Sequence, residues 1–331
     1  MKNDLTVTIC MFNAEKFIVE TLESLYHQTK KQFNLLILDD ASTDKSVAVA
    51  DTYLKLKDWK NCEIIQFKSN RGLAYLRNDA LNMVETEYMF FNDADDIAHT
   101  NLLEQLYLKI TSEKNINVVS CYAKYIDENS KPLPGGLFFG PTTEEEFYNR
   151  CKENKMIWMN AASMFKVEAA RKAGGWNLKG FPKDSKVRYQ DLAEDVDMWN
   201  RIADFYIDGE IMLTIPRVLR DYRKNPFSLS SGKQNTFALQ NRIRQIKKNM
   251  ILRREGNQEL TYLEFINKLT LLEKTRYFFV DHSAYYYKLA GMNYMKRSYL
   301  QFIFNLSISI IYNPKYLIMK IKNNNIKKKN G

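Results

Sequence analysis

The feature that most constrains this chain is a regular alternation of short apolar runs and amphipathic segments over its first 91 residues. Leu5–Met11 is a β-branched apolar run bounded by polar residues, and residues 33–38 form a second apolar run. Both patterns are typical of buried strands. Between them, residues 14–29 place apolar side chains at helical spacing, with Asn13 as the expected N-cap. The alternation continues with helices at 44–57 and 73–84 and strands at 63–67 and 88–91.

Four strands that alternate with helices predict βαβ units and an α/β fold with a mainly parallel sheet flanked by helices. In open sheets of this kind, ligands bind beyond the carboxyl ends of the strands. Residues 12–13, 39–40 and 92–96 follow or end three of the predicted strands and contain polar clusters. We therefore expect functional residues at this edge of the sheet.

From residue 101 onward the pattern is less regular. Residues 131–141 are rich in Pro and Gly and predict a loop, and residues 210–222 predict a hairpin of two strands around Pro216. A further strand is expected at 117–125. Helices are expected at 101–112, 144–151, 167–173 and 192–205, and the chain is mostly helical after residue 234.

The cysteine and histidine content limits the chemistry. The chain has four cysteines, far apart and with no CxxC spacing, so neither a zinc cage nor a secreted disulfide scaffold is expected. This pattern suits a reducing compartment. Only three histidines are present, so carboxylates are expected to do any acid, base or metal-binding work. The early Asp4 and the lack of the 7–15-residue apolar core region typical of a signal peptide do not match such a peptide; a cytoplasmic location is expected.

The formal net charge of +10 is concentrated in the last third of the chain, because residues 231–331 carry 19 basic and 5 acidic side chains. We expect a basic helical extension there, after a domain at 1–230. Polar residues interrupt the apolar stretch 299–319, which lacks the roughly 20 consecutive apolar residues of a spanning helix. This stretch could lie on the inner face of the cell membrane, or it could pack on the domain ahead of a frayed tail. Its mixture of apolar and basic residues argues against a nucleic-acid partner.

The sharpest local motif is NDADD at 92–96, directly after a predicted strand. In an extended chain residues i and i+2 face the same way, so Asp93 and Asp95 can present two carboxylates to one point. Hard divalent cations that bridge phosphate oxygens prefer such ligands. A solvated turn or a helix cap would account for the same residues, so the motif by itself leaves both interpretations open.

Two further acidic pairs occur at predicted element ends. Asp39 and Asp40 close the second strand, where one of them could accept hydrogen bonds from a base or a ribose; capping accounts for Asp44 but not for both of these. Glu194 and Asp195 fall in the first turn of a predicted helix, whose dipole would lower the pKa of a carboxylate and keep it ionised as a general base. Ordinary helix capping would favour the same acids.

Seven short segments carry a further signal when taken in order: VTICMFNAEKF, LILDDASTD, NRGLAYLRN, FFNDADD, AGGWN, EDVDMWNRIA and YRKNPFSLS. Their order and spacing resemble those of family 2 glycosyltransferases of the GT-A fold, and the resemblance covers roughly residues 5–232. It implies transfer of a hexose or N-acetylhexosamine from a nucleotide-sugar, a UDP-sugar in the first instance, to an acceptor hydroxyl with inversion. Mn²⁺ or Mg²⁺ would assist. Residues 1–115 would form the nucleotide-binding half and 116–230 the acceptor-side half.

Carried over position by position, the resemblance implies roles on the nucleotide side. Phe12 would lie beside the base. Asp40, with Asp39 as the less favoured alternative, would recognise uracil or ribose. Arg77 would support the nucleotide side of the site.

The same comparison implies roles at the reacting end. Asp95 would be the metal ligand, and Asp93 would lie nearer the ribose and donor sugar and share in metal binding. Trp176 would lie near the donor sugar and the acceptor. Asp195 would be the catalytic base.

A loop at 222–230 would close over the diphosphate, with positive charge from Arg223 and Lys233. Two departures from the family pattern stand out. Cys10 and Phe12 occupy positions where the family commonly has Pro and Tyr. Asn225 occupies a position where a histidine commonly completes the metal site, so the metal would be held more weakly or through water.

The acceptor implied by the family and by the basic extension is a glycan or glycolipid of cell-surface polysaccharide synthesis. Two other function classes remain open at this point. A non-catalytic protein that binds sugars or a membrane surface could retain the same fold. A sugar-phosphate nucleotidyltransferase is less favoured, because the Gly-rich first loop with Arg that such enzymes use does not follow the first strand.

Overall fold

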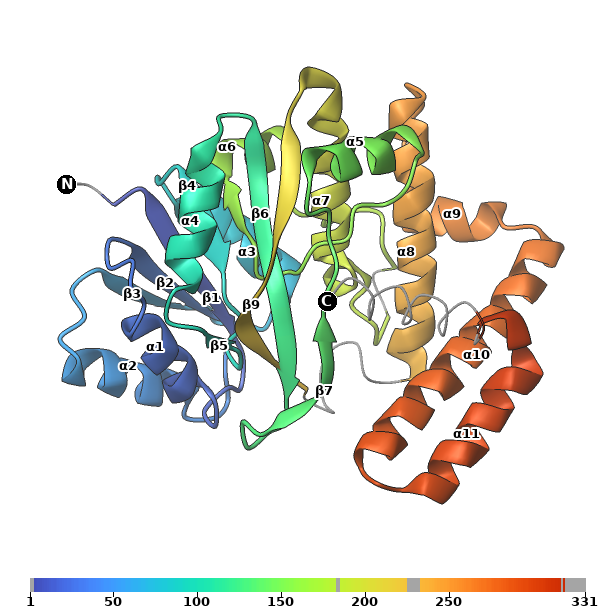
Figure 1. The fold of residues 1–331 in the computed structure, drawn as a ribbon, viewed down its shortest axis with the longest axis horizontal. Coiled ribbons are helices and arrows are strands. Elements are labelled where there is room, and N and C mark those ends of the chain that lie inside the picture. Colours follow the sequence, from blue (N-terminus) through green and yellow to red (C-terminus); the bar gives the residue numbers. More distant parts are fainter. Residues whose placement is uncertain (1–2, 183–184, 225–232, 317, 319–331) are drawn as a thin grey trace. The chain divides into compact units, whose positions relative to one another are not determined.

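The structure is a computed structural model that describes residues 3–182, 185–224, 233–316 and 318, apart from the side chains of 233–235 and 295. The chain divides into two compact units (Figure 1). The first contains Met1–Lys179, Ala193–Asn225 and Ile246–Glu259, and the second contains Gly180–Leu192, Pro226–Gln245 and Leu260–Gly331.

The first unit is built on one nine-stranded sheet in the order β3-β2-β1-β4-β8-β6-β9-β5, with β7 paired to β6. Its strands are β1 (Leu5–Met11), β2 (Asn34–Asp39), β3 (Cys62–Gln66), β4 (Tyr88–Phe91), β5 (Ile97–Ala98), β6 (Ile116–Ile126), β7 (Pro132–Leu137), β8 (Met164–Lys166) and β9 (Ile211–Arg223). β1 and β4 are central and almost wholly buried, which explains their continuous apolar sequences.

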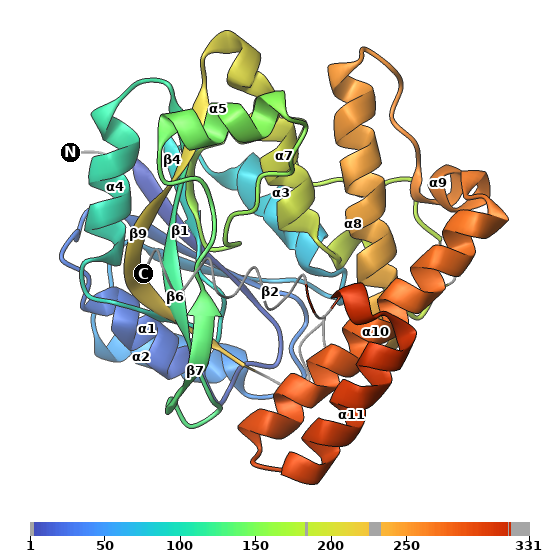
Figure 2. The same cartoon turned by 45° about the vertical axis from the view of Figure 1, so that its right-hand side comes forward.

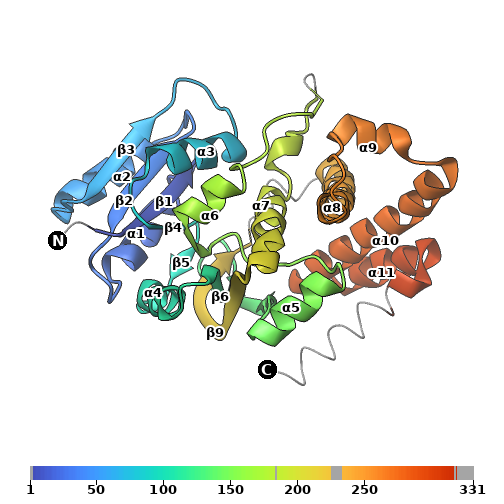
Figure 3. The ribbon, with the colours of Figure 1, turned by 90° about the horizontal axis from the view of Figure 1, so that it is seen from above.

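Helices cover both faces of this sheet. They are α1 (Ile18–Tyr26), α2 (Ser46–Leu56), α3 (Leu73–Met83), α4 (Leu102–Ser112), α5 (Glu144–Lys152), α6 (Val167–Lys172) and α7 (Glu194–Ala203). Figure 3 shows α1 and α2 on one face and α3 on the other. This follows from right-handed crossovers, because the chain steps outward from β1 to β3 and then returns past β1 to β4.

The predicted βαβ units are confirmed: β1 pairs in parallel with β2 and β4, and β2 pairs in parallel with β3. The second half of the sheet is mixed. β6 pairs in parallel with β9, whereas β8, β7 and β5 pair antiparallel with their neighbours. The result is the α/β sheet expected from the sequence, with a mixed second half that the sequence pattern did not specify.

The expected hairpin at 210–222 is wrong, because β9 is one continuous strand. Cys121 pairs with Ile215, but the next residue, Tyr122, pairs with Val218. Pro216 therefore lies in a bulge, where the lack of a backbone N–H breaks no ladder hydrogen bond. A proline that predicted a turn instead marks an irregularity within one strand.

Two local expectations also need correction. The Pro/Gly-rich segment at 131–141 contains the short strand β7. Asn13 does not cap the first helix, which begins at Ile18. The Asn13 side chain instead accepts a hydrogen bond from the backbone N–H of Thr43 at 2.8 Å and so holds two loops together.

The second unit is helical, as the sequence predicts. It holds α9 (Tyr262–Lys268), α10 (Leu271–Met295), α11 (Tyr299–Tyr312) and the first part of α8 (Lys233–Arg254). Capping boxes start α9 and α10, at Thr261 and Thr270 respectively. Figure 2 shows α10 and α11 side by side as a helical hairpin. Within the described part of the chain, no helix combines the length and apolar character needed to traverse a bilayer.

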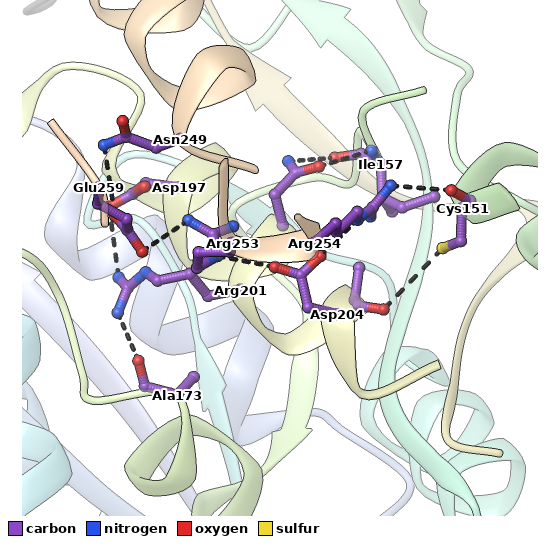
Figure 4. Close-up of polar contacts among 12 residues, drawn as sticks. Cys151, Ile157, Ala173, Asp197, Arg201, Asp204, Asn249, Arg253, Arg254 and Glu259 are labelled. Carbon is purple, nitrogen blue, oxygen red and sulfur yellow. Dashed lines mark hydrogen bonds and ion pairs between the residues drawn. The ribbon is translucent and has the colours of Figure 1, made fainter. Parts of the chain in front are cut away.

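An arginine-rich network holds the last turns of α8 within the first unit (Figure 4). The Asp204 carboxylate accepts hydrogen bonds from Arg253 Nε at 2.7 Å and from Arg254 Nε at 2.8 Å. Arg254 Nη1 also donates to the carbonyl of Cys151 at 2.9 Å. One partly buried carboxylate therefore neutralises two arginines at a junction of three segments.

We expect Asp204→Ala to lower the free energy of unfolding by about 3 kcal/mol, because it removes the carboxylate that pairs with Arg254 and leaves Arg253 only its second partner, Glu259. Asp208→Ala is the matched control. Asp208 is 61% exposed and pairs with Lys172, which is also exposed, so its loss should change stability by less than about 1 kcal/mol. Urea denaturation followed by circular dichroism measures both. Equal effects would show that the network does not stabilise the unit.

Candidate active site

The carboxyl ends of β1, β2 and β4 bring the predicted residues to one edge of the sheet. Met11, the last residue of β1, pairs with Asp39, and Thr8 pairs with Phe91 at the end of β4. The segments that follow these strands are therefore neighbours. Phe12 is 48% exposed there, an unusual position for a large aromatic side chain and one that leaves a ring face open to a ligand.

Asp39 and Asp40 are both buried but make different contacts. The Asp40 carboxylate accepts hydrogen bonds from the backbone N–H groups of Arg71 and Gly72, at 2.7 and 2.8 Å. It thereby fixes the loop that leads into α3. Asp39 Oδ2 accepts from Ser42 N at 3.1 Å, while its Oδ1 is buried without a hydrogen-bond partner among the described residues. An unpaired buried carboxylate oxygen is costly unless a ligand or water satisfies it.

The acidic turn after β4 uses its three aspartates differently. Asp96 is fully buried, pairs with Arg220 Nη1 at 2.9 Å and accepts from the backbone N–H of Arg223 at 2.9 Å. It therefore anchors β9 to this turn. Asp93 and Asp95 are only partly buried. The motif at 92–96 contains all three acids, but only Asp93 and Asp95 were expected to have a role; Asp96 forms a buried ion pair.

Asp93 and Asp95 lie close enough to interact strongly. Burial, and secondly the negative charge of Asp93, raise the pKa of the Asp95 carboxyl to about 6. A divalent cation would relieve both effects, and carboxylate oxygens suit Mn²⁺ or Mg²⁺. No group of three or more His, Cys, Asp or Glu side chains in the described ranges is arranged to hold a metal. The pair therefore fits a metal whose shell is completed by oxygens from another source, such as a diphosphate or water.

Arg77 connects the acidic turn to α7. The side chain lies on α3 and is almost fully buried. Its Nη1 donates to Glu194 Oε1 at 2.7 Å, and its Nη2 lies 3.9 Å from Asp93 Oδ1. The guanidinium also stacks over the Phe91 ring, 5.0 Å from its centroid. Three elements that are distant in the sequence therefore meet at one charged group.

Asp195 follows Glu194 in the first turn of α7 and is partly exposed. The expectation of a lowered pKa is wrong in its net direction, because burial outweighs the backbone N–H groups at the start of α7, which do lower the pKa of Asp195. Burial raises the pKa of Asp195, the positive charge of Arg77 opposes this, and the negative charge of Asp93 adds to it. The influence of Arg77 and Asp93 also shows that Asp195 belongs to the same cluster of charges.

Trp176 does not line an open surface. Its side chain is 2% exposed and packs edge-to-face against Phe91, with ring centroids 5.5 Å apart, and against Phe165. Asn78 holds the Trp176 backbone through two hydrogen bonds, at 2.7 and 2.8 Å. Trp176, which was expected near the donor sugar and the acceptor, therefore offers almost no exposed surface, and the Arg77 guanidinium lies 6.0 Å from its ring centroid.

Arg223 is likewise not free to bind a diphosphate. Its side chain is 1% exposed, and Nη2 pairs with Glu20 at 2.6 Å. Its Nε donates to the carbonyl of Asp95 at 2.8 Å, and Nη1 donates to the carbonyl of Asp127 at 2.8 Å. All three guanidinium nitrogens are thus used internally, so Arg223 is a clamp on the acidic turn. The Lys233 side chain and Asn225 lie outside the described residues.

Sequence reasoning missed several residues of this cluster. The sequence indicated only that Glu194 lies in the first turn of a helix. In the structure Glu194 forms an ion pair with Arg77, 117 positions away in the chain. Asp96 and Arg220 form a buried pair across 124 positions, and no local pattern indicates it. Cys10, noted for its departure from the family, lies near Arg77, Asp93 and Asp40, and burial raises the pKa of its thiol to about 12.

Left-handed backbone conformations occur at this edge, as they do at four other residues besides glycine in the described part of the chain. Asn13, Ala41 and Ala193 have φ values of 50°, 60° and 52°, in the left-handed region that residues other than glycine avoid. Each directly follows or precedes a residue of the cluster: Phe12, Asp40 and Glu194. Such conformations cost about 1–3 kcal/mol each and tend to occur where a functional geometry requires them.

The comparison with known sequences matches the part of the chain that contains most of the residues of this site. The model for glycosyl transferase family 2 matches residues 6–174. A teichoic acid poly(glycerol phosphate) polymerase of Staphylococcus epidermidis is 45% identical over 94 residues, which cover 28% of this chain and 13% of that protein. The glycosyltransferase GlyG of Streptococcus pneumoniae serotype 4 is 27% identical over 180 residues, which cover 54% and 53% of the two chains. The chain thus matches about half or less of these relatives' length.

Two solved structures share the fold. Residues 1–349 of S. aureus TarS in complex with UDP-GlcNAc superpose with a TM-score of 0.54 at 16% identity, over 94% of this chain and 92% of that one. The mannosyltransferase PcManGT from Pyrobaculum calidifontis, in complex with GDP-Man and Mn²⁺, gives 0.53 at 17% identity, over 96% and 88%. The fold is the GT-A fold expected from the sequence. Since the family model spans more than half of the residues, this chain belongs to glycosyl transferase family 2.

Proposed function

We propose that this chain transfers a sugar from a nucleotide-sugar to an acceptor hydroxyl with inversion at the anomeric carbon. The observation that carries the proposal is the charge cluster around Arg77, which links Asp93 of the acidic turn to the first turn of α7, where Asp195 lies. A donor held at the acidic turn would therefore face a carboxylate suited to activate the acceptor.

The nucleotide is proposed to bind at the ends of β1 and β2. Phe12 offers an exposed ring on which a base can stack. Asp39 has a buried oxygen with no partner among the described residues, whereas both oxygens of Asp40 already accept backbone hydrogen bonds. We therefore favour Asp39 for recognition of the base or ribose, with Asp40 as the residue that shapes the loop. A UDP-sugar is the preferred donor class, and a hexose or N-acetylhexosamine the preferred sugar.

The chemical step is proposed to depend on Asp195 as general base. Its carboxylate would accept the proton of the acceptor hydroxyl while that oxygen attacks the anomeric carbon from the face opposite the leaving diphosphate. A single displacement of this kind inverts the anomeric centre. The raised pKa of Asp195 favours this role, because a base whose pKa lies closer to neutral binds the transferred proton more tightly than an ordinary aspartate.

Asp95 and Asp93 are proposed to hold a divalent cation together with oxygens of the donor. When bound, Mn²⁺ or Mg²⁺ would neutralise the charge that develops on the leaving diphosphate. The buried Arg77 holds Asp93 and Glu194 in place through its ion pairs with their carboxylates. We keep the division into a nucleotide-binding half at 1–115 and an acceptor-side half at 116–230 as part of the proposal.

The acceptor is proposed to be a glycan or glycolipid in cell-surface polysaccharide synthesis. Support comes from the similarity to a teichoic acid poly(glycerol phosphate) polymerase and from the fold shared with TarS. The proposal concerns the class of acceptor alone.

The donor class can be tested with UDP-, GDP- and dTDP-sugars in thermal-shift and calorimetric titrations, with and without Mn²⁺. We expect one nucleotide class to raise the melting temperature in a Mn²⁺-dependent way, because a ligand that binds only the folded state stabilises it. Asp95→Ala should lose the Mn²⁺-dependent part of this binding, while Asp58→Ala, at an exposed surface position, should keep it. Unchanged donor affinity in Asp95→Ala would contradict the metal assignment.

Asp195→Asn should reduce turnover by about 10²–10⁴-fold and leave donor affinity unchanged, because the amide keeps the shape of the side chain but cannot take up the proton. Product formation measured by chromatography gives turnover, and calorimetry gives donor affinity. Asp208→Asn serves as the control and should be fully active. Near-normal turnover of the Asp195 variant would remove Asp195 from the mechanism.

The pH profile offers an independent check. Asp195 must be ionised to act as a base, so kcat/KM should fall as the pH drops through its pKa. Burial raises that pKa above the ordinary aspartate value of about 4, so the acid limb should lie above this pH. The residual activity of Asp195→Asn should lack this limb. A wild-type profile that stays flat down to about pH 4 would contradict the assignment.

A further inference from the structure

The hairpin of α10 and α11 has an unusual distribution of polarity. Its contact surface contains polar side chains: Asn305 and Ser309 of α11 are buried, and Ser283 of α10 is buried opposite them. Ser283 Oγ donates to the carbonyl of Ser309 at 2.9 Å, and Ser309 Oγ donates to the carbonyl of Ser283 at 2.8 Å. Small hydroxyl residues at a helix–helix contact are typical of helices that pack in an apolar medium.

The outward side of α11 is apolar. Leu300 is 86% exposed and Ile311 is 80% exposed, and Ile303 and Phe304 between them are also exposed. These residues follow the i, i+3, i+4, i+11 spacing of a single helix face. In a helix surrounded by water an apolar face is normally buried, whereas in α11 these four apolar residues are exposed and the polar Asn305 and Ser309 are buried.

The first half of α10 shows a similar exposed face. Leu271, Leu272, Phe278 and Phe279 are all exposed, and they form two pairs at i, i+7 spacing. Exposed apolar side chains that occur singly are normal, but contiguous ones on two packed helices indicate an interaction surface. We call these faces of α10 and α11, with their flanking cations, the hairpin surface.

The charge of this region has one sign. Residues 282–331 contain nine lysines and arginines and no aspartate or glutamate. Lys296, Arg297 and Lys315 lie at the two ends of α11 and are exposed, and Lys274 is exposed in the first turn of α10. Of the nearest acids, Asp281 is buried and accepts from Arg244 Nη1 at 2.9 Å, and Glu273 is used in the capping box of α10.

We propose that the hairpin surface docks on an anionic phospholipid bilayer. An apolar face inserts among the acyl chains near the headgroups, and cations beside it attract anionic lipids. A helix of 14 residues spans only about 21 Å, less than the hydrocarbon core, so α11 would lie along the interface and not cross it. Two copies of the same surface would bring like charges together, which makes a lipid surface the better partner than a second chain.

This inference rests on the second unit alone and does not depend on the proposed sugar transfer. The triple variant Leu300→Ser, Phe304→Ser, Ile311→Ser removes the apolar contribution at exposed positions, and its fold can be verified by circular dichroism and thermal melting. The matched control replaces three exposed apolar residues of the first unit: Leu56→Ser, Leu108→Ser, Ile207→Ser.

Flotation of the full chain with phosphatidylglycerol-containing vesicles should show binding that weakens as salt is added, because exposed charges are screened. Vesicles of phosphatidylcholine alone should bind much less protein. The triple variant should bind the anionic vesicles about tenfold less or weaker still, and the control variant should bind like the wild type. Donor binding in solution should be the same for all three proteins, which separates this test from that of the proposed function.

Equal flotation of the wild type and the triple variant would overturn the proposal, and so would equal binding to neutral and anionic vesicles. A concentration-dependent dimer in sedimentation experiments, lost in the triple variant and without vesicle binding, would assign the surface to a second copy instead. If the triple variant does not fold, Lys274→Gln, Lys296→Gln, Lys315→Gln provides the second test. Each exposed lysine removed should weaken binding to anionic vesicles by about fivefold.

Discussion

The site depends on the burial of one charge, the guanidinium of Arg77. A buried arginine is tolerated only where carboxylates neutralise it, and here Glu194 and Asp93 do so from different segments of the chain. Because α3, the turn after β4 and α7 each contribute one charged group, they cannot move apart without exposing an unpaired ion to an apolar environment. Asp195 gains its position from this arrangement, since it is the neighbour of Glu194 in the first turn of α7. The electrostatics of the interior thus determine where the proposed base lies.

A second set of buried pairs determines which acids of the turn after β4 remain available. The Asp96 carboxylate accepts hydrogen bonds from the Arg220 side chain and from the backbone N–H of Arg223. The Arg223 side chain in turn donates to the carbonyl of Asp95. This leaves the side chains of Asp93 and Asp95 near each other and partly exposed, and burial together with the negative charge of Asp93 raises the pKa of Asp95. The positive charges of Arg220 and Arg223 would suit phosphate binding, but both side chains make structural contacts in this protein.

The two units follow opposite rules of burial. In the first, the sheet buries the apolar side chains of β1 and β4. In the α10–α11 hairpin Ser283, Asn305 and Ser309 are buried, while Leu300, Phe304 and Ile311 are exposed. The two units therefore differ in the kinds of side chain that they bury and expose.

The sequence by itself determined the features that depend on neighbours a few positions apart: the alternation of strands and helices, the parallel first half of the sheet, and the acids at the ends of β2 and β4. The tertiary structure decided everything that depends on partners far apart in the chain. The bulge at Pro216, the burial of Trp176, the occupied guanidinium of Arg223 and the raised rather than lowered pKa of Asp195 are all of this kind. The physical reason is that local periodicity reports which face of an element is buried, whereas the state of a buried charge is set by the particular groups that the fold brings around it.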